Sequence, residues 1–118
     1  MVKTALDLKR TIKAFVNAAK DEIEVEKVFL TGRHASERSP SDGDIWLLVI
    51  SPSFEGLSVP ERVDKLARIG LRIDSLVQSW GFTPAELSRT LKGDGGSPFL
   101  GMMLNQSREV YSNPAASN

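Results

Sequence analysis

Acidic residues placed around a glycine turn are the part of this sequence whose types and spacing suit chemistry. Asp42-Gly43-Asp44 directly precede an apolar run, and Gly32 ends an earlier apolar segment. Carboxylate oxygens are the ligands that Mg²⁺ prefers, and a glycine without a Cβ lets a phosphate approach backbone N–H groups. A third acid, Asp74, belongs to a later segment. Each acid alone is typical of a turn or a solvated strand, so their joint spacing with Gly32 is what indicates a function.

Three predicted strands must position these residues. Lys27–Thr31 (KVFLT) is short and largely apolar and stops at a glycine, which predicts a buried strand. Asp44–Ile50 (DIWLLVI) is apolar after its first residue, which is typical of a central strand covered on both faces. Leu71–Trp80 begins with apolar and polar residues in alternation. This alternation predicts a third strand that carries Asp74 and ends at Gly81.

Four helices are predicted around these strands. The first runs from residue 5 to about residue 24, and a second starts at a capping box with proline in its first turn, residues 58–61. The same capping logic opens a helix from Thr83 to about Lys92, and Ser97 precedes a last helix through Leu104. The residues predicted to be buried are Leu8, Ile12, Phe15, Ala19 and Ile23 in the first helix and Val63, Leu66 and Ala67 in the second.

The order helix, strand, strand, helix, strand, helix, helix predicts an α/β (α+β) fold. We expect a small mixed β-sheet of three or more strands with helices packed on it. At 118 residues the chain fits one domain, which we place at residues 1–112, followed by a disordered tail at residues 113–118.

Composition excludes several classes of protein. The 41% apolar and 25% charged content is that of a globular chain without the apolar run of a membrane span, so we expect no membrane partner. The absence of cysteine and the charged N-terminus favour a cytoplasmic location. A net charge of zero argues against strong binding to duplex nucleic acid. Oligomeric state leaves no signal in the sequence.

The segment VFLTGRHASERSPSDGDIWLLVI resembles the signature of the polymerase-β-like nucleotidyltransferase superfamily. In that signature a strand ends in Gly-Ser, about ten residues follow, and Asp-x-Asp opens the next strand. Here Gly32-Arg33 stand at the first position, ten residues intervene, and Asp44-Ile45-Trp46 stand at the second. Arg72-Ile73-Asp74 resembles the place of the family's third carboxylate, and TPAEL with SPFL resembles the last helices of the minimal, single-domain members.

This resemblance implies a reaction and a set of site residues. The reaction is transfer of a nucleoside monophosphate from a nucleoside triphosphate to an acceptor hydroxyl, with Mg²⁺ as the cofactor. Asp44 and Asp74 would be the catalytic metal ligands. Gly32, Arg33 and His34 would lie near the triphosphate, although a lone histidine in a polar loop is more typical of an exposed side chain.

Trp46 and Arg33 depart from the family pattern. Trp46 stands where the acid that bridges the two metals would be, and an indole offers only an N–H donor. Two alternatives would keep a metal site: a shifted register that uses Asp42 and Asp44, or a one-metal site from Asp44 and Asp74. Arg33 replaces the serine, and it would bind a phosphate or form a salt bridge with Asp44 or Asp74.

Two functions therefore compete. The first is a weak or inactive nucleotidyltransferase. The alternative is a catalytically degenerate binding module, such as the antitoxin-like partner of a HEPN-type helical protein, because minimal nucleotidyltransferases are commonly paired with such proteins. Trp46 is more typical of core packing than of a ligand platform, although a nucleotide base stacked on it would also fit its chemistry. We expect Trp80 to pack at the end of its segment, and Met102 and Met103 to fill the core or an interface.

Overall fold

A four-stranded mixed sheet forms the centre of the computed structural model, which describes residues 5–32, 45–73 and 77–114. The strands are β1 (Lys27–Thr31), β2 (Ile45–Ile50), β3 (Val77–Phe82) and β4 (Ser107–Ser112), in the order β3-β2-β1-β4. Strands β2 and β3 are parallel, whereas β1 pairs antiparallel with both β2 and β4. The predicted fold class is therefore confirmed.

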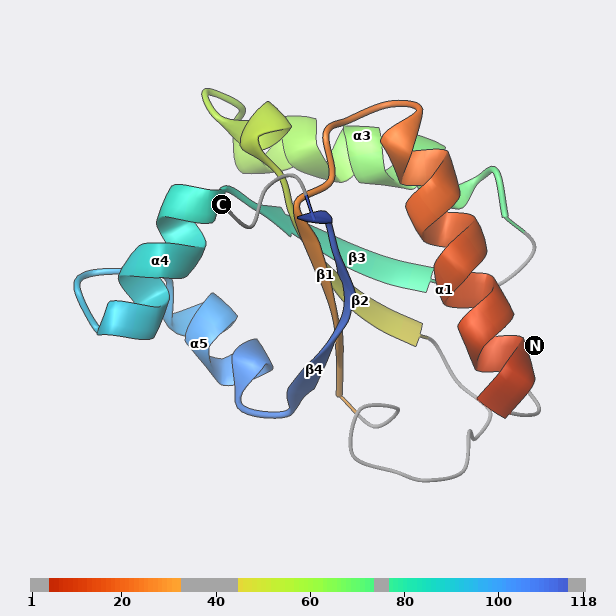
Figure 1. The fold of residues 1–118 in the computed structure, drawn as a ribbon. Coiled ribbons are helices and arrows are strands. Elements are labelled where there is room, and N and C mark those ends of the chain that lie inside the picture. The colour runs from red at the N-terminus through yellow and green to blue at the C-terminus, as the bar shows by residue number, and fades with distance from the viewer. Residues whose placement is uncertain (1–4, 33–44, 74–76, 115–118) are drawn as a thin grey trace.

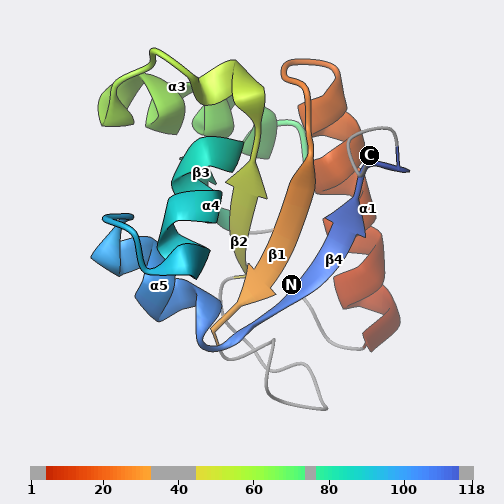
Figure 2. The same cartoon turned by 60° about the vertical axis from the view of Figure 1, so that its left-hand side comes forward.

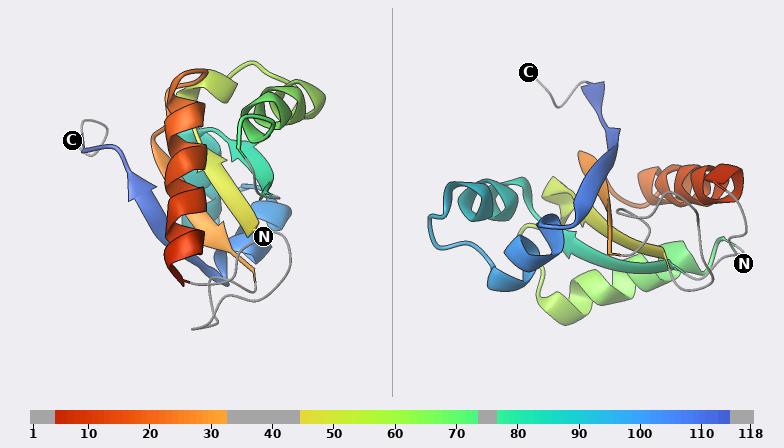
Figure 3. Two further views of the ribbon diagram at one scale, coloured as in Figure 1. Left: turned by 90° about the vertical axis from the view of Figure 1, so that its right-hand side faces the viewer. Right: turned by 90° about the horizontal axis from the view of Figure 1, so that it is seen from below.

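Helices cover both faces of this sheet (Figures 1 and 2). Helices α1 (Ala5–Lys20) and α3 (Val59–Gly70) pack on one face, and α4 (Pro84–Lys92) and α5 (Pro98–Leu104) pack on the other. A short 3₁₀ helix, η1 (Pro52–Phe54), follows β2. Figure 3 shows the sheet from its side and from below, between α1 and the α4/α5 pair. None of the described helices combines the length and the hydropathy that a membrane span requires.

Two hydrophobic cores result from the alternation of side chains along the strands. In β2, Ile45, Leu47 and Val49 join the core beneath α1 and α3, whereas Leu48 and Ile50 join the core beneath α4 and α5. The five residues predicted to face inward from the first helical segment are all buried: Leu8, Ile12, Phe15, Ala19 and Ile23. A strand with buried residues on both faces explains the nearly unbroken apolar run that predicts it.

Helix starts follow their predicted capping residues. Ser58 and Thr83 accept hydrogen bonds from the backbone N–H groups of Glu61 and Glu86, and the carboxylate of each glutamate accepts a hydrogen bond from the backbone N–H of its cap residue. Ser97 caps α5 by accepting from the N–H of Leu100. Proline stands in the first turn of all three helices. These local signals are confirmed because each is satisfied within four residues and needs no tertiary partner.

The third strand lies later than predicted. Helix α3 continues to Gly70, Leu71 and Arg72 form a turn, and β3 runs from Val77 to Phe82. The guanidinium of Arg72 forms an ion pair of 2.8 Å with Asp21 and donates to the carbonyl of Ala18, which links the ends of α3 and α1. The predicted start of the third strand at Leu71 was therefore wrong, whereas the last residues of the predicted segment, Val77 to Trp80, do lie in a strand.

Gly81 lies inside β3, so the prediction that it ends the segment was also wrong. A Cβ at Gly81 would lie 2.6 Å from Cε2 of the fully buried Phe54, so glycine is needed there for close packing. Two further corrections concern helices: α1 ends at Lys20, and the outer side of α3 leaves Val63 and Ala67 exposed while Leu66 and Ile69 are buried. Strand β4 had no counterpart in the sequence analysis.

Candidate functional site

Gly32 and Trp46 are the two positions of the resemblance that the structure describes at the candidate site. Arg33, His34, Asp42, Asp44 and Asp74 lie outside the described residues, so their predicted roles stay predictions. Trp46 is the second residue of β2 and pairs in register with Thr31, the last residue of β1. The end of β1 and the start of β2 thus bring Gly32 and Trp46 together, as the spacing of the signature requires.

Gly32 adopts a left-handed backbone conformation with φ of 77°, which favours glycine. Its N–H donates a 3.1 Å hydrogen bond to the carbonyl of Gln106, in the connection between α5 and β4. A Cβ built on Gly32 would lie 3.1 Å from Cε3 of Trp46, so the indole ring lies directly against this turn. The N–H of this glycine turn is thus already bonded to Gln106, and the indole of Trp46 lies where a Cβ would be.

Trp46 is partly exposed, contrary to the expectation that it belongs to the core. Its side chain points to the α4/α5 side of the sheet, as the alternation with the buried Leu48 and Ile50 requires. The residue retains 42% of its accessible surface, whereas the other five residues of β2 are buried. Because only its indole N–H is polar, position 46 presents a large apolar surface where the family pattern has an oxygen ligand.

Three aromatic rings pack against one another from Trp46 onward, and an exposed methionine follows the last of them on the same helix. The ring centroids of Trp46 and Trp80 lie 5.8 Å apart in an edge-to-face arrangement, and those of Trp80 and Phe99 lie 5.9 Å apart. Phe99 is 40% exposed, and Met102, one turn further along α5, is 62% exposed. We call Trp46, Trp80, Phe99 and Met102 the aromatic surface. Both Met102 and Met103 were expected to fill the core or an interface. Met103 is buried, and Met102 is exposed.

A buried polar contact holds α5 against the end of β1. The hydroxyl of Thr31 donates to the carbonyl of Met103 at 2.7 Å, and both residues are buried. Together with the bond from Gly32 to Gln106, it fixes the last turn of α5 beside the glycine turn. Trp80 also packs against the core beneath α4 and α5, so the aromatic surface is supported from below.

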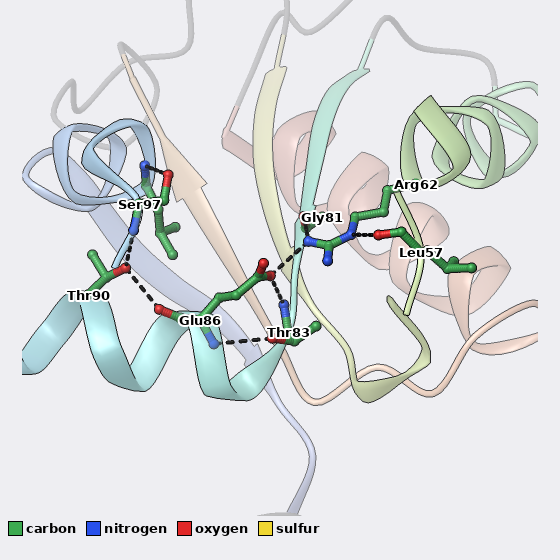
Figure 4. Close-up of polar contacts among 8 residues, drawn as sticks. Leu57, Arg62, Gly81, Thr83, Glu86, Thr90 and Ser97 are labelled. Carbon is green, nitrogen blue, oxygen red and sulfur yellow. Dashed lines mark hydrogen bonds and ion pairs between the residues drawn. The ribbon is translucent and has the colours of Figure 1, made fainter. Parts of the chain in front are cut away.

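Arg62 connects the two helices that flank β3 (Figure 4). Its guanidinium donates to the carbonyls of Leu57 and Gly81 at 3.1 and 3.2 Å, and forms a 2.7 Å ion pair with Glu86 at the start of α4. Further along α4, the Thr90 hydroxyl accepts a 3.1 Å hydrogen bond from the N–H of Ser97. These bonds set the positions of α4 and α5, and so of Phe99 and Met102.

The same network shifts the pKa of Glu86. Partial burial would raise the pKa of this carboxyl, but hydrogen bonds from Arg62 and from the Thr83 backbone, with the positive charge of Arg62, lower it overall. Glu86 is therefore a charged carboxylate that serves as a cap and an ion-pair partner.

Within residues 5–32, 45–73 and 77–114, no three acidic or histidine side chains gather in a way that would hold a metal ion. Trp46 itself supplies no oxygen, so the described part of the site does not fit two Mg²⁺ ions bridged at position 46. Asp42, Asp44 and Asp74 are the acids to which a metal would have to bind, and they fall outside this range. The described residues are suited to apolar contact.

Phe99, Arg62 and Glu86 have roles that the sequence analysis missed. Phe99 lies in the SPFL run, which resembles a family helix without indicating which residue faces the sheet. Glu86 was identified as a capping residue, and its second partner, Arg62, lies 24 residues earlier. Local sequence patterns do not reveal a contact between residues this far apart across β3.

Comparisons with known proteins show which solved structures have a similar fold. No family model and no curated protein matches the sequence. A proposed nucleotidyltransferase from Sulfolobus solfataricus has a similar structure, with a TM-score of 0.63 and 17% identity over 96% of this chain and 91% of that chain. A chain from a toxin–antitoxin structure with AMP-PNP gives a TM-score of 0.57 at 15% identity, over 87% of this chain and 74% of that chain.

A third solved structure contains a tri-AMPylated HEPN toxin from Shewanella oneidensis in complex with an MNT antitoxin. A chain of that complex gives a TM-score of 0.56 at 14% identity, over 91% of this chain and 74% of that chain. These likenesses confirm the predicted minimal nucleotidyltransferase fold. At such identities they bear on the fold alone.

Proposed function

We propose that this chain is a catalytically degenerate nucleotidyltransferase-like module that binds a HEPN-type helical protein in an antitoxin-like role. The observation that carries the proposal is the placement of Trp46, which lies against the Gly32 turn and contacts Trp80. This arrangement puts apolar surface where nucleotidyl transfer needs a second metal-binding carboxylate. The complexes of the structural neighbours with HEPN toxin support the choice of partner.

Exposed aromatic side chains would give a module without catalytic activity a means of binding a protein. Trp46 and Phe99 expose aromatic surface on elements that the sheet and the Thr31–Met103 bond hold in place. Aromatic residues are enriched at the centres of protein interfaces, where their large rings bury much apolar area. A site that has exchanged an acid for an indole is thus better suited to hold a protein than a triphosphate. The cytoplasmic location expected from the composition is compatible with such a partner.

Nucleotidyl transfer is the second candidate, and the left-handed turn at Gly32 favours it. Gly32 has no Cβ and a positive φ, which would let the backbone of this turn approach a phosphate closely. In this case Asp44 and Asp74, or Asp42 and Asp44, would hold one Mg²⁺. Gly32, Arg33 and His34 would face the nucleoside triphosphate.

An assay of nucleotidyl transfer tests the proposal. The purified chain is incubated with α-labelled ATP and Mg²⁺, alone and with a HEPN-type protein, and transfer of AMP to either protein is measured. The proposal predicts no transfer above that of an Asp44→Asn variant, which serves as the control. Transfer by the unmodified chain that the variant lacks would establish the second candidate instead.

A further inference from the structure

We infer that the outer side of α3 is an interface between two copies of this chain, which pack α3 against α3 in antiparallel orientation about a two-fold axis. The inference goes beyond the proposed function. Helix α3 covers the opposite face of the sheet from α4 and α5, so this interface is separate from the aromatic surface (Figure 1).

An apolar row runs along the outer side of α3 and its C-cap residue. Its members recur at every fourth position, which places them one above the other on the helix surface: Val59, Val63, Ala67 and Leu71. All four are exposed, and the three large ones retain 71%, 55% and 86% of their accessible surface. A surface helix ordinarily carries polar residues opposite its buried side, and contiguous exposed apolar surface marks an interaction site. We call these four residues the outer row.

Asp64 and Arg68 flank the outer row on one side. They form an exposed ion pair of 2.9 Å. Each follows a member of the row by one position, so each lies about 100° further around the helix than that member. The buried Leu66 precedes a member by one position and therefore lies equally far in the opposite direction. The outer row thus has one charged border and one border that is turned toward the core.

An antiparallel two-fold packing lays the charged border of one copy against the charged border of the other. A residue n positions before the axis then lies beside the residue n positions after it in the second copy. Packed helices interlock their side chains instead of opposing them head-on. For a row that repeats every four residues, an axis near its centre achieves this at position 64 or position 66. In either register each row residue lies midway between two row residues of the second copy.

Charge selects between these two registers. An axis at position 64 would set Asp64 against the same aspartate of the second copy, and opposed like charges are unfavourable. An axis at position 66 sets Asp64 opposite Arg68 of the second copy, and Arg68 opposite Asp64 of that copy. It also places Ala67, the smallest member of the outer row, next to the axis. The outer row is therefore complementary to itself in both shape and charge, which identifies a second copy of the chain as its occupant.

Sedimentation of the full chain from micromolar to millimolar concentration, without nucleotide or partner, tests this inference. We expect reversible dimers whose population rises with concentration. Ala67→Glu places two like charges beside the axis and should weaken association by at least about tenfold. Leu91→Glu is the matched control, because it adds the same charge at an exposed residue of α4 on the other face of the sheet, and it should leave association unchanged.

Two charge-exchange variants test the register. In Asp64→Arg both flanking positions are positive, and in Arg68→Asp both are negative, so each variant should repel its own copy. An equimolar mixture restores both contacts between opposite charges. We therefore expect dimers in the mixture at a concentration where neither variant forms them alone. An exposed ion pair contributes little to stability, so both variants should remain folded.

Several results would overturn the inference. A chain that stays monomeric at millimolar concentration would do so, as would dimers that Ala67→Glu and Leu91→Glu weaken equally. Dimers that survive Ala67→Glu but are lost in Met102→Asp would assign self-association to the aromatic surface instead. A mixture of the charge-exchange variants that associates no better than either variant alone would exclude the antiparallel register.

Discussion

At the scale of single residues, the Gly32–Trp46 pair explains why this turn keeps its glycine. A backbone φ of 77° disfavours any residue with a Cβ, and the indole of Trp46 leaves only 3.1 Å for such an atom. The glycine is thus required by the protein's own packing, whether or not a phosphate ever approaches it. The functional glycine of the signature and a structural glycine cannot be distinguished by sequence at this position.

Replacing Gly32 by alanine is expected to lower the free energy of unfolding by about 2 kcal/mol, because alanine is strained in the left-handed region and its methyl group crowds the indole. Urea unfolding measures this loss in the unmodified background and again in Trp46→Ala. We expect a smaller loss in the second background, where only the backbone strain remains. The same loss in both backgrounds would mean that the ring does not press on the turn.

At the scale of elements, the carboxylate of Glu86 links α4 to α3. Glu86 caps its own helix through Thr83 and also binds Arg62, which spans from α3 to the backbone of β3. Glu61 occupies the same third position of α3 and accepts a hydrogen bond from the N–H of its cap residue Ser58, but it is exposed and pairs with no cation among the described residues. The two glutamates therefore form a matched pair that differs in the contact with arginine.

Glu86→Gln is expected to lower the free energy of unfolding at pH 7 by about 1–2 kcal/mol, because the variant loses a charged hydrogen bond. The folded pKa of Glu86 is lowered, so its stabilising effect is present above the unfolded pKa and is lost as the pH falls through the folded one. The stability difference between the unmodified chain and the variant should therefore shrink below about pH 4. Urea unfolding at pH 7 and pH 3 measures it.

Glu61→Gln is the control for this experiment. A glutamine at either position can still accept the capping hydrogen bond, so we expect the control to cost less than Glu86→Gln at pH 7. An equal cost for the two variants, or a cost for Glu86→Gln that is the same at both pH values, would show that the ion pair with Arg62 does not hold α4.

At the scale of the whole molecule, the fold was largely predictable and the aromatic surface was not. Capping boxes and the apolar run of β2 are local patterns, so they predicted helix starts and the central strand. Strand β4 (SREVYS) has no apolar alternation, and it exists because it pairs with β1 from the far end of the chain. The aromatic surface likewise joins three elements that are distant in sequence, so neither the exposure of Trp46 nor its contact with Trp80 could be predicted.

Val63 is a residue for which the sequence pattern predicted burial that the structure does not show. Its spacing on α3 fits the buried face, but it lies on the outer side of the helix and is exposed. Periodicity predicts which residues share a face of a helix, whereas the extent of the sheet beneath decides which of them are covered. Asp44 and Asp74 lie outside the described residues, so their role as metal ligands stays a prediction.

Calorimetric titration with ATP, with and without Mg²⁺, tests the central claim most directly. If Trp46 has converted a nucleotide site into a protein-binding surface, the unmodified chain should show no magnesium-dependent heat at millimolar ATP. Trp46→Asp, which restores the family's second acid, provides the comparison for a recovered site. Magnesium-dependent binding by the unmodified chain that disappears in Asp44→Asn would contradict the account, because it would mean that the site still holds its metal and its nucleotide.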